Sequence, residues 1–171
     1  VIKANCKSTG QDVAIKLIQY SEKNNCEVQI LMKLYHPNIV QIYEAGEHRG
    51  TGHWIYIVME LCSMNLEEYV RHNPANPDKA LQFLKQIVAA VDFMHKRNIA
   101  HRDIKPPNIL ISKCGNLIKF SDFGISKEIP DSLTSVTTTS YGAGTEGYRA
   151  PEVYDPNYKV TLRSDIFSLG L

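Results

Sequence analysis

The chain has 171 residues, of which 43% are hydrophobic and 22% are charged, and its formal net charge is +1. This length is sufficient for one domain with a sizeable core, and the composition is that of a globular protein and not of a disordered one. The near-neutral charge gives no reason to expect nucleic-acid binding or an anionic membrane surface as a partner, and no apolar run reaches the roughly 18 residues that span a bilayer.

The first half of the chain alternates predicted strands with one predicted helix. Residues 12–18 are rich in β-branched side chains and predict a strand. The helical run that follows carries apolar residues that recur on one face: Val28, Leu31, Met32 and Leu34. We expect it to stop at residues 36–38, because proline disfavours helix at the residue before it. Two further strands are expected over residues 39–43 and 54–59, separated by a polar turn that contains glycine.

The second half is predicted to be mainly helical. Asn76-Pro77-Asp78 indicates the start of a long helix. Its apolar residues form a stripe with a period of 3.6 residues, which predicts core packing: Leu81, Leu84, Ile87, Val88, Val91 and Met94. Beyond Phe123 the chain is rich in Ser, Thr and Gly up to about Gly147, and a polar segment this long between ordered elements is typical of a functional loop.

Two motifs carry the chemistry. The first, H-R-D-I-K-P-P-N, occupies residues 101–108, and the second, D-F-G, occupies residues 122–124. Together they supply a base, a cation and two metal ligands at the spacings that phosphoryl transfer from ATP requires. A lone D-F-G arises easily by chance, whereas the compound pattern does not. The chain therefore resembles a protein kinase, and the resemblance covers essentially all of its residues.

The resemblance implies the α+β, bilobal protein-kinase fold in truncated form. A small β-rich N-lobe with helix αC is expected over residues 1–60. The hinge and the first part of a mainly helical C-lobe, cut within helix αF, are expected over residues 61–171, with the activation segment at 122–152. The Gly-rich loop of the family would precede Val1, and the chain has no initiator methionine or signal peptide. We therefore expect a partial kinase domain that folds poorly and shows little activity by itself.

ATP and Mg²⁺ are the cofactors that the resemblance implies. Lys16, in V-A-I-K, would neutralise the α- and β-phosphates of ATP, because a long cation anchored on a strand holds charge at a fixed place. Glu27 would be the carboxylate of helix αC that pairs with Lys16, and Glu22 is the alternative. The full set of expected cofactor-binding residues is Val1, Ala14, Lys16, Glu27, Met59, Glu60, Cys62 and Leu110. Within that set, Met59 would be the gatekeeper, and the hinge backbone that follows would bind the adenine edge.

Four residues of the two motifs are expected to act on the phosphates and on the acceptor. Asp103 would accept the proton of the substrate hydroxyl and orient it, and Lys105 would stabilise charge on the transferred phosphoryl group. Asn108 and Asp122 would hold Mg²⁺, since hard divalent cations prefer oxygen ligands. Lys105 together with Thr145 in G-T-E-G-Y resembles serine/threonine kinases and not tyrosine kinases.

The implied function is an ATP-dependent protein serine/threonine kinase acting on a protein substrate with a Ser or Thr acceptor. Arg102 beside Asp103 indicates control by phosphorylation of the activation segment, and a homodimer would serve trans-autophosphorylation. Candidate phosphosites are Thr134, Ser135, Thr137, Thr138, Thr139 and Ser140. The alternative for this segment is a flexible loop whose hydroxyls serve only solubility.

Two further alternatives concern the kind of kinase. Several stretches resemble the kinase/endoribonuclease stress sensors of the unfolded-protein response: E-L-C leading to N-L-E-E-Y-V, N-I-L-I-S, G-T-E-G and D-I-F-S. Translation-initiation-factor kinases and generic microbial Ser/Thr kinases are the alternatives to this subfamily. The four scattered cysteines fit reduced thiols and a cytoplasmic kinase domain, although such a sensor could be anchored in the endoplasmic-reticulum membrane. The other class of protein is a pseudokinase scaffold. It predicts that at least one of four residues is lost, and all four are present here: Lys16, Asp103, Asn108 and Asp122.

Overall fold

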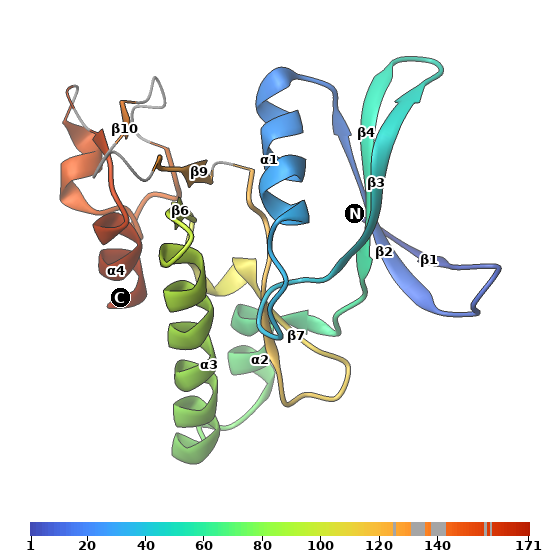
Figure 1. The fold of residues 1–171 in the computed structure, drawn as a ribbon. Helices are drawn as coiled ribbons and strands as arrows, with labels where there is room; N and C mark the ends of the chain where they lie inside the picture. The colour runs from blue at the N-terminus through green and yellow to red at the C-terminus, as the bar shows by residue number, and fades with distance from the viewer. Residues whose placement is uncertain (125, 131–135, 138–142, 156, 158) are drawn as a thin grey trace.

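The chain folds into a β-rich N-terminal part and a mainly helical C-terminal part, shown in Figure 1 as a computed structural model. The structure describes all residues except 125, 131–135, 138–142, 156 and 158, and of residues 23, 26, 27, 136 and 137 it describes the backbone alone. The α+β class expected from the sequence is confirmed.

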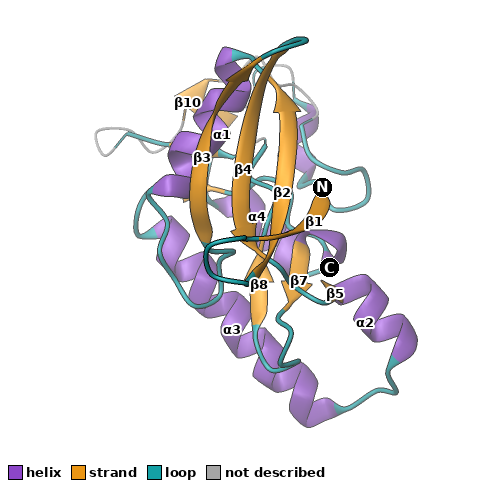
Figure 2. Ribbon diagram, turned by 90° about the vertical axis from the view of Figure 1, so that its right-hand side faces the viewer, coloured by secondary structure: helices purple, strands orange, loops and turns teal. Residues whose placement is uncertain are grey.

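The N-terminal part is a four-stranded antiparallel sheet in the order β1-β2-β4-β3. Its strands are β1 (Ile2–Asn5), β2 (Asp12–Gln19), β3 (Ile42–Arg49) and β4 (His53–Glu60). Helix α1 (Glu22–Met32) lies beside this sheet (Figures 1 and 2). The helix begins at Ser21, whose hydroxyl accepts a hydrogen bond of 3.1 Å from the backbone N–H of Asn24.

Two sequence predictions for this part are wrong in detail. Met32, expected on the buried face of α1, is 59% exposed, and Leu34 is buried but follows the end of the helix. The helix ends early because the backbone N–H groups of residues 33 and 34 donate to carbonyls three residues back, which tightens the last turn. The strand expected over residues 39–43 begins only at Ile42, because the backbone N–H of Val40 donates instead to the carbonyl of Phe120 in the C-terminal part.

The C-terminal part is built on three α-helices within the described residues: α2 (Leu66–His72), α3 (Pro77–His95) and α4 (Arg163–Leu169). Three small sheets accompany them, β5 (Met64–Asn65) with β7 (Ile109–Ile111) and β8 (Ile118–Phe120), β6 (Ile99–Ala100) with β9 (Lys127–Glu128), and β10 (Val136–Thr137) with β11 (Lys159–Val160). Two 3₁₀ turns are η1 (Pro106–Asn108) and η2 (Pro151–Tyr154). None of the helices in the described part of the chain combines the length and apolarity that crossing a bilayer would need.

Helix α3 starts where the sequence predicts it. The side chain of Asn76 accepts a hydrogen bond of 3.0 Å from the backbone N–H of Lys79, and Pro77 occupies the first turn. The predicted apolar stripe is only half right: Ile87, Val91 and Met94 are buried, whereas Leu81, Leu84 and Val88 are 51%, 48% and 49% exposed. The stripe spans two neighbouring helix faces, and only one of them packs against β6 and β8.

One hydrophobic core joins the two parts of the chain. Ile57 of β4, Phe120 of β8, Phe123 and Met94 of α3 have no exposed surface, and all belong to the same cluster. Burial of this apolar surface holds the N-terminal sheet over the segment that carries the two chemical motifs.

Candidate active site

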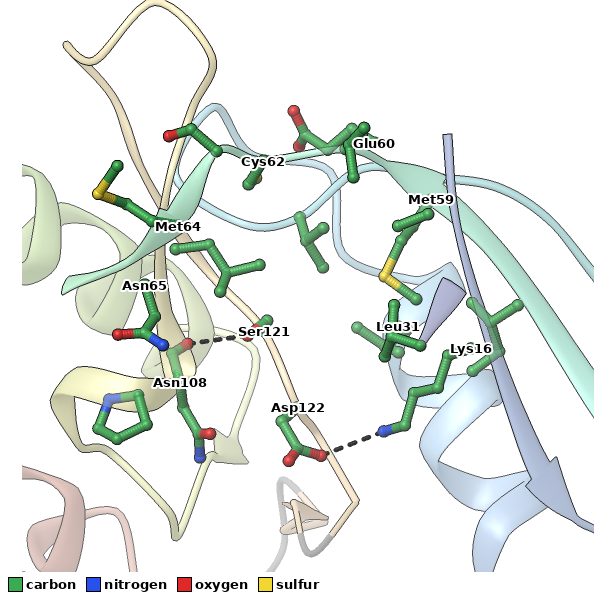
Figure 3. A pocket seen from close by; sticks show the side chains of 18 of the residues that line it. Lys16, Leu31, Met59, Glu60, Cys62, Met64, Asn65, Asn108, Ser121 and Asp122 are labelled. Carbon is green, nitrogen blue, oxygen red and sulfur yellow. Dashed lines mark hydrogen bonds and ion pairs between the residues drawn. The ribbon is translucent and has the colours of Figure 1, made fainter. Parts of the chain in front are cut away.

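A cavity of about 390 Å³ lies under the N-terminal sheet, and it is large enough for a small-molecule ligand (Figure 3). The two parts of the chain both contribute to its walls. Nine of the ten site residues predicted to bind cofactor or metal line it: Val1, Ala14, Lys16, Met59, Glu60, Cys62, Asn108, Leu110 and Asp122. The tenth is Glu27, which belongs to α1 by its backbone.

Several lining residues were missed by sequence reasoning. They include Leu31 of α1, Ile57 of β4 and Ser121, which immediately precedes Asp122. Ile57 could have been found, because it shares a face of β4 with Met59 in the two-residue period of a strand. No local pattern singles out Leu31, since its position in the cavity depends on how α1 lies against the sheet.

Lys16 and Asp122 meet across the cavity. The Lys16 ammonium, at the end of a side chain from β2, is 3.2 Å from a carboxylate oxygen of Asp122, as the dashed line in Figure 3 shows. The Asp122 side chain remains 52% exposed, so part of its carboxylate is open to the cavity. The predicted pairing of Lys16 with Glu27 falls on a side chain outside the described residues, and the alternative, Glu22, is an exposed residue in the first turn of α1.

Asn108 and Asp122 offer the donor atoms that a hard cation prefers. The amide nitrogen of Asn108 donates to the backbone oxygen and to a carboxylate oxygen of Asp103, over 2.8 and 2.7 Å, which leaves its amide oxygen as an acceptor. Both side chains line the same cavity. No group of three or more His, Cys, Asp or Glu that could hold a metal occurs among the described residues. The donor set therefore fits a Mg²⁺ ion that takes its remaining oxygens from phosphate and water.

Asp103 sits at the centre of a hydrogen-bonded network beside the cavity. One carboxylate oxygen accepts from the backbone N–H and the hydroxyl of Thr145, over 3.0 and 2.7 Å. The other lies 2.9 Å from the ammonium of Lys105 and also accepts the bond from Asn108. Lys105 in turn donates to the hydroxyl of Thr145. The network holds the carboxylate in one orientation and links residues 103–108 to Thr145, which is 42 residues from Asp103 in the sequence.

Electrostatics keep Asp103 ionised. Burial raises the pKa of this carboxyl group, but hydrogen bonds from Lys105, Thr145 and Asn108 outweigh burial and hold the pKa below its usual range. An ionised carboxylate accepts hydrogen bonds and protons, as a residue that orients a hydroxyl must.

Thr145 reaches Asp103 because Gly144 lets two backbone segments approach closely. Gly144 has a φ of +100°, and a Cβ atom there would lie 2.7 Å from the carbonyl oxygen of Arg102. Both the positive φ and the absence of space favour glycine. The side chain of Arg149 donates a 2.7 Å bond to the carbonyl of Gly144, which links residues 144 and 149 within this segment.

Asp165 anchors the backbone at the start of residues 101–108 (the catalytic loop). Its carboxylate, which has no exposed surface, accepts hydrogen bonds of 2.8 and 2.7 Å from the backbone N–H groups of His101 and Arg102. It also lies 2.9 Å from Nε2 of His95 in α3. Three segments of the C-terminal part thus meet at one buried carboxylate.

His101 links the catalytic loop to the strand that leads into Asp122. Its Nε2 lies 3.1 Å from the carbonyl oxygen of Ser121, and its Nδ1 lies 3.3 Å from the backbone N–H of Asp103. The neutral tautomer with the proton on Nε2 satisfies both bonds. Burial lowers the pKa of this imidazole, against the opposing charge of Asp165, so the ring is neutral at physiological pH.

Three cysteines have described side chains, and they differ in their acidity. Burial, and secondarily the charge of Glu60, raises the pKa of Cys62 in the cavity wall to about 11. On the turn between β1 and β2, hydrogen bonds from Ser8 and then Thr9 lower the pKa of Cys6 to about 7. Cys114 is exposed, and all three are free thiols.

The candidate phosphosites lie mostly outside the described residues. These are Thr134, Ser135, Thr138, Thr139 and Ser140, while Thr137 is described by its backbone in β10. Their role therefore stays a prediction.

Comparisons with known proteins identify the family of the chain. The family model described as "Protein kinase domain" matches residues 1–171. The chain is 40% identical to the serine/threonine-protein kinase PrkC of Bacillus subtilis, over 94% of this chain and 25% of that protein. It is 37% identical to the serine/threonine-protein kinase PknB of Mycobacterium tuberculosis, over 94% of this chain and 27% of that protein. It is also 36% identical to CBL-interacting serine/threonine-protein kinase 15 of Arabidopsis thaliana, over all of this chain and 42% of that protein.

The chain thus spans about a quarter of the length of the two bacterial relatives. The region of the chain that matches includes the cavity and residues 101–108. With the whole chain matched by one family model, the chain belongs to the protein kinase domain family.

Proposed function

We propose that the chain is part of a protein serine/threonine kinase that transfers the γ-phosphoryl group of ATP to a Ser or Thr hydroxyl of a protein. The network in which Lys105, Thr145 and Asn108 hold the ionised Asp103 beside the cavity carries this proposal. Family membership and the printed names of the relatives support it. The protein kinase family generally uses ATP and Mg²⁺.

The lining of the cavity suggests where each part of ATP would bind. Apolar side chains that include Val1, Ala14 and Leu110 would contact the adenine ring, and the backbone of Glu60 and Cys62 would hydrogen-bond its edge. Met59 would close the back of the pocket as gatekeeper.

The polar end of the cavity would receive the phosphates. Lys16 would contact the α- and β-phosphates, and Asn108 with Asp122 would hold Mg²⁺. The bound ion would neutralise charge on the phosphates. The ammonium of Lys16 and the carboxylate of Asp122 are only 3.2 Å apart. The group for the phosphates and a group for Mg²⁺ therefore lie at the same end of the site.

In the transfer itself, the acceptor hydroxyl forms a bond to the γ-phosphorus while the bond from that phosphorus to the oxygen of ADP breaks. Asp103 orients the hydroxyl and takes its proton, and Lys105 stabilises charge on the transferred group. Thr145 keeps both side chains in place through its hydroxyl.

Transfer of labelled phosphate tests the proposal. The full-length natural protein is incubated with ATP labelled at the γ-position, Mg²⁺ and casein, and phosphoserine and phosphothreonine are then identified. Asp103→Asn and Asp122→Asn should each abolish labelling, whereas Asp92→Asn, a change at an exposed surface pair with Lys96, should not. Nucleotide binding by the natural protein without any transfer would favour a pseudokinase scaffold, whose partner binding would survive Asp122→Asn.

Autophosphorylation of the activation segment, residues 122–152, is the second part of the proposal. The support is the run of hydroxyl residues in this segment and the basic Arg102 beside Asp103. A rate of self-labelling that rises with the square of protein concentration would indicate transfer between two copies, and thus a transient homodimer. A rate of self-labelling that is first order in protein concentration would indicate transfer within one copy.

The sequence on either side of the chain decides the subfamily of this kinase. The N-L-E-E-Y-V, G-T-E-G and D-I-F-S stretches favour a kinase module of an unfolded-protein-response endoribonuclease sensor, and the relatives named above favour a different type of Ser/Thr kinase. Sequencing outward from both ends of the chain separates them. A membrane span upstream and a nuclease-like domain downstream would place the kinase on the endoplasmic reticulum, and their absence would favour a cytoplasmic kinase.

A further inference from the structure

A buried ion pair lies directly behind the hinge. The ammonium of Lys119 is 2.8 Å from a carboxylate oxygen of Glu60, and the two side chains are only 11% and 19% exposed. Among the residues whose burial is described, Lys119 is the only buried lysine or arginine. Exposed ion pairs contribute little to stability, whereas loss of one partner from a buried pair leaves an uncompensated charge and is strongly destabilising.

The position of Lys119 in its strand explains the reach of its side chain. In the β7–β8 pair Lys119 lies directly opposite Leu110, so both side chains emerge on the same face of the sheet. Leu110 lines the cavity, whereas Lys119 extends beside it to Glu60. The strand that carries Lys119 ends at Phe120, and the next two residues, Ser121 and Asp122, line the cavity.

Glu60 determines where the backbone leaves β4 and becomes the hinge. The oxygen that meets Lys119 also accepts a 2.7 Å bond from the backbone N–H of Gln41, and the backbone N–H of Glu60 donates to the carbonyl of Gln41 over 2.9 Å. Glu60 is the last residue of β4, and it lines the cavity together with Leu61 and Cys62. The carboxylate therefore fixes the first residue of the segment, residues 60–62, that lines the cavity.

We propose that Lys119 is a positioning residue for nucleotide binding: through Glu60 it holds the backbone of residues 60–62 where the base of ATP needs it. Lys119 does not line the cavity and touches no reacting atom, so it acts on affinity and not on the chemical step. The inference rests on the proposed nucleotide site. Without Lys119, the Glu60 carboxylate would be left largely buried and uncompensated, and it would turn toward water and release the hinge.

Steady-state kinetics and direct ATP binding in the full-length protein test this role. Lys119→Met should raise the KM and the Kd for ATP about tenfold and leave kcat within about twofold. This pattern is expected when a variant weakens binding of the ground state and of the transition state equally. Lys119→Arg, which keeps the charge, should stay within about threefold of the natural KM. Lys113→Met is the matched control, because this lysine pairs with Asp12 on the surface and should leave both constants unchanged.

A double variant separates the charge effect from general disruption. Glu60→Gln in the Lys119→Met background removes the uncompensated carboxylate, so its KM should lie closer to the natural value than that of Lys119→Met alone. An unchanged KM in Lys119→Met, or a fall in kcat with KM unchanged, would overturn the inference. If Lys119→Met does not fold, Lys119→Gln takes its place and the same outcomes apply. A natural protein that binds no ATP would instead refute the proposed function and, with it, this inference.

Discussion

The hydroxyl of Thr145 donates a 2.7 Å hydrogen bond to Asp103 while accepting one from Lys105, so a single side chain holds both charged groups in place. Thr145→Val keeps the shape and removes the hydroxyl. Because hydrogen bonds to charged groups contribute about 1.5–3 kcal/mol, we expect kcat to fall by about 10- to 100-fold. The measurement is kcat with saturating ATP and protein substrate.

Thr145→Ser is the matched control, since it retains the hydroxyl, and its kcat should stay within about fivefold of the natural value. Equal activity in the Val variant and the natural protein would show that the hydroxyl does not align the site.

The neutral, buried His101 makes the fold sensitive to acid. An unfolded chain protonates this ring near its ordinary pKa of about 6.5, whereas burial lowers the pKa in the folded state. The unfolded state therefore binds more protons between the two pKa values. The free energy of unfolding should fall by up to about 1.4 kcal/mol per unit as pH drops below about 6.5, until the folded-state pKa is reached.

Urea denaturation between pH 7.5 and 5 measures this dependence. His101→Gln does not titrate there, so its unfolding free energy should be lower at pH 7.5 but should decline less steeply. His36, whose pKa burial also lowers, needs the parallel variant His36→Gln, because it adds to the same slope. Identical slopes for His101→Gln and the natural protein would contradict the assignment.

Asp165 is expected to matter more for stability than any surface carboxylate. In Asp165→Asn one acceptor becomes a donor that faces a backbone N–H, so a buried hydrogen bond is lost and a donor is left unsatisfied. We expect a loss of about 2–4 kcal/mol of unfolding free energy. Asp92→Asn removes an exposed pair with Lys96 and should cost less than about 0.5 kcal/mol. Chemical denaturation of the two variants side by side decides between a buried anchor and an incidental contact.

The two faces of α3 should respond differently to truncation. Met94 has no exposed surface, so Met94→Ala removes core contacts and should cost about 2–5 kcal/mol. Val88 is 49% exposed, and Val88→Ala should change stability by no more than about 0.5 kcal/mol. A similar large loss at both positions, seen as equal shifts of the urea midpoint, would mean that Val88 is covered in the natural protein.

Features fixed by neighbouring residues could be predicted from the sequence. Asn76 and Pro77 start α3 through contacts within one turn, and the spacing within residues 101–108 is itself the chemical motif. Features that depend on packing could not. Periodicity marks Val88 as apolar on a helix, but it does not say which half of a wide stripe meets the sheet.

Contacts between distant segments show the same limit within the site. Glu60 was predicted for its backbone, and nothing near Lys119 in the sequence indicates that its ammonium reaches that carboxylate. Thr145 was noted as a marker of serine/threonine kinases, while its bonds to Asp103 depend on the approach of a segment 42 residues away and on Gly144.

The raised pKa of Cys62 has a consequence for chemical labelling of the nucleotide cavity. With a pKa of about 11, about one molecule in ten thousand carries the reactive thiolate at pH 7, whereas Cys6, with a pKa of about 7, is about half ionised. Iodoacetamide at neutral pH should therefore alkylate the turn between β1 and β2 and spare the hinge. An electrophilic inhibitor can reach Cys62 only if its own binding in the cavity holds the warhead against the sulfur long enough to compensate for the scarcity of thiolate.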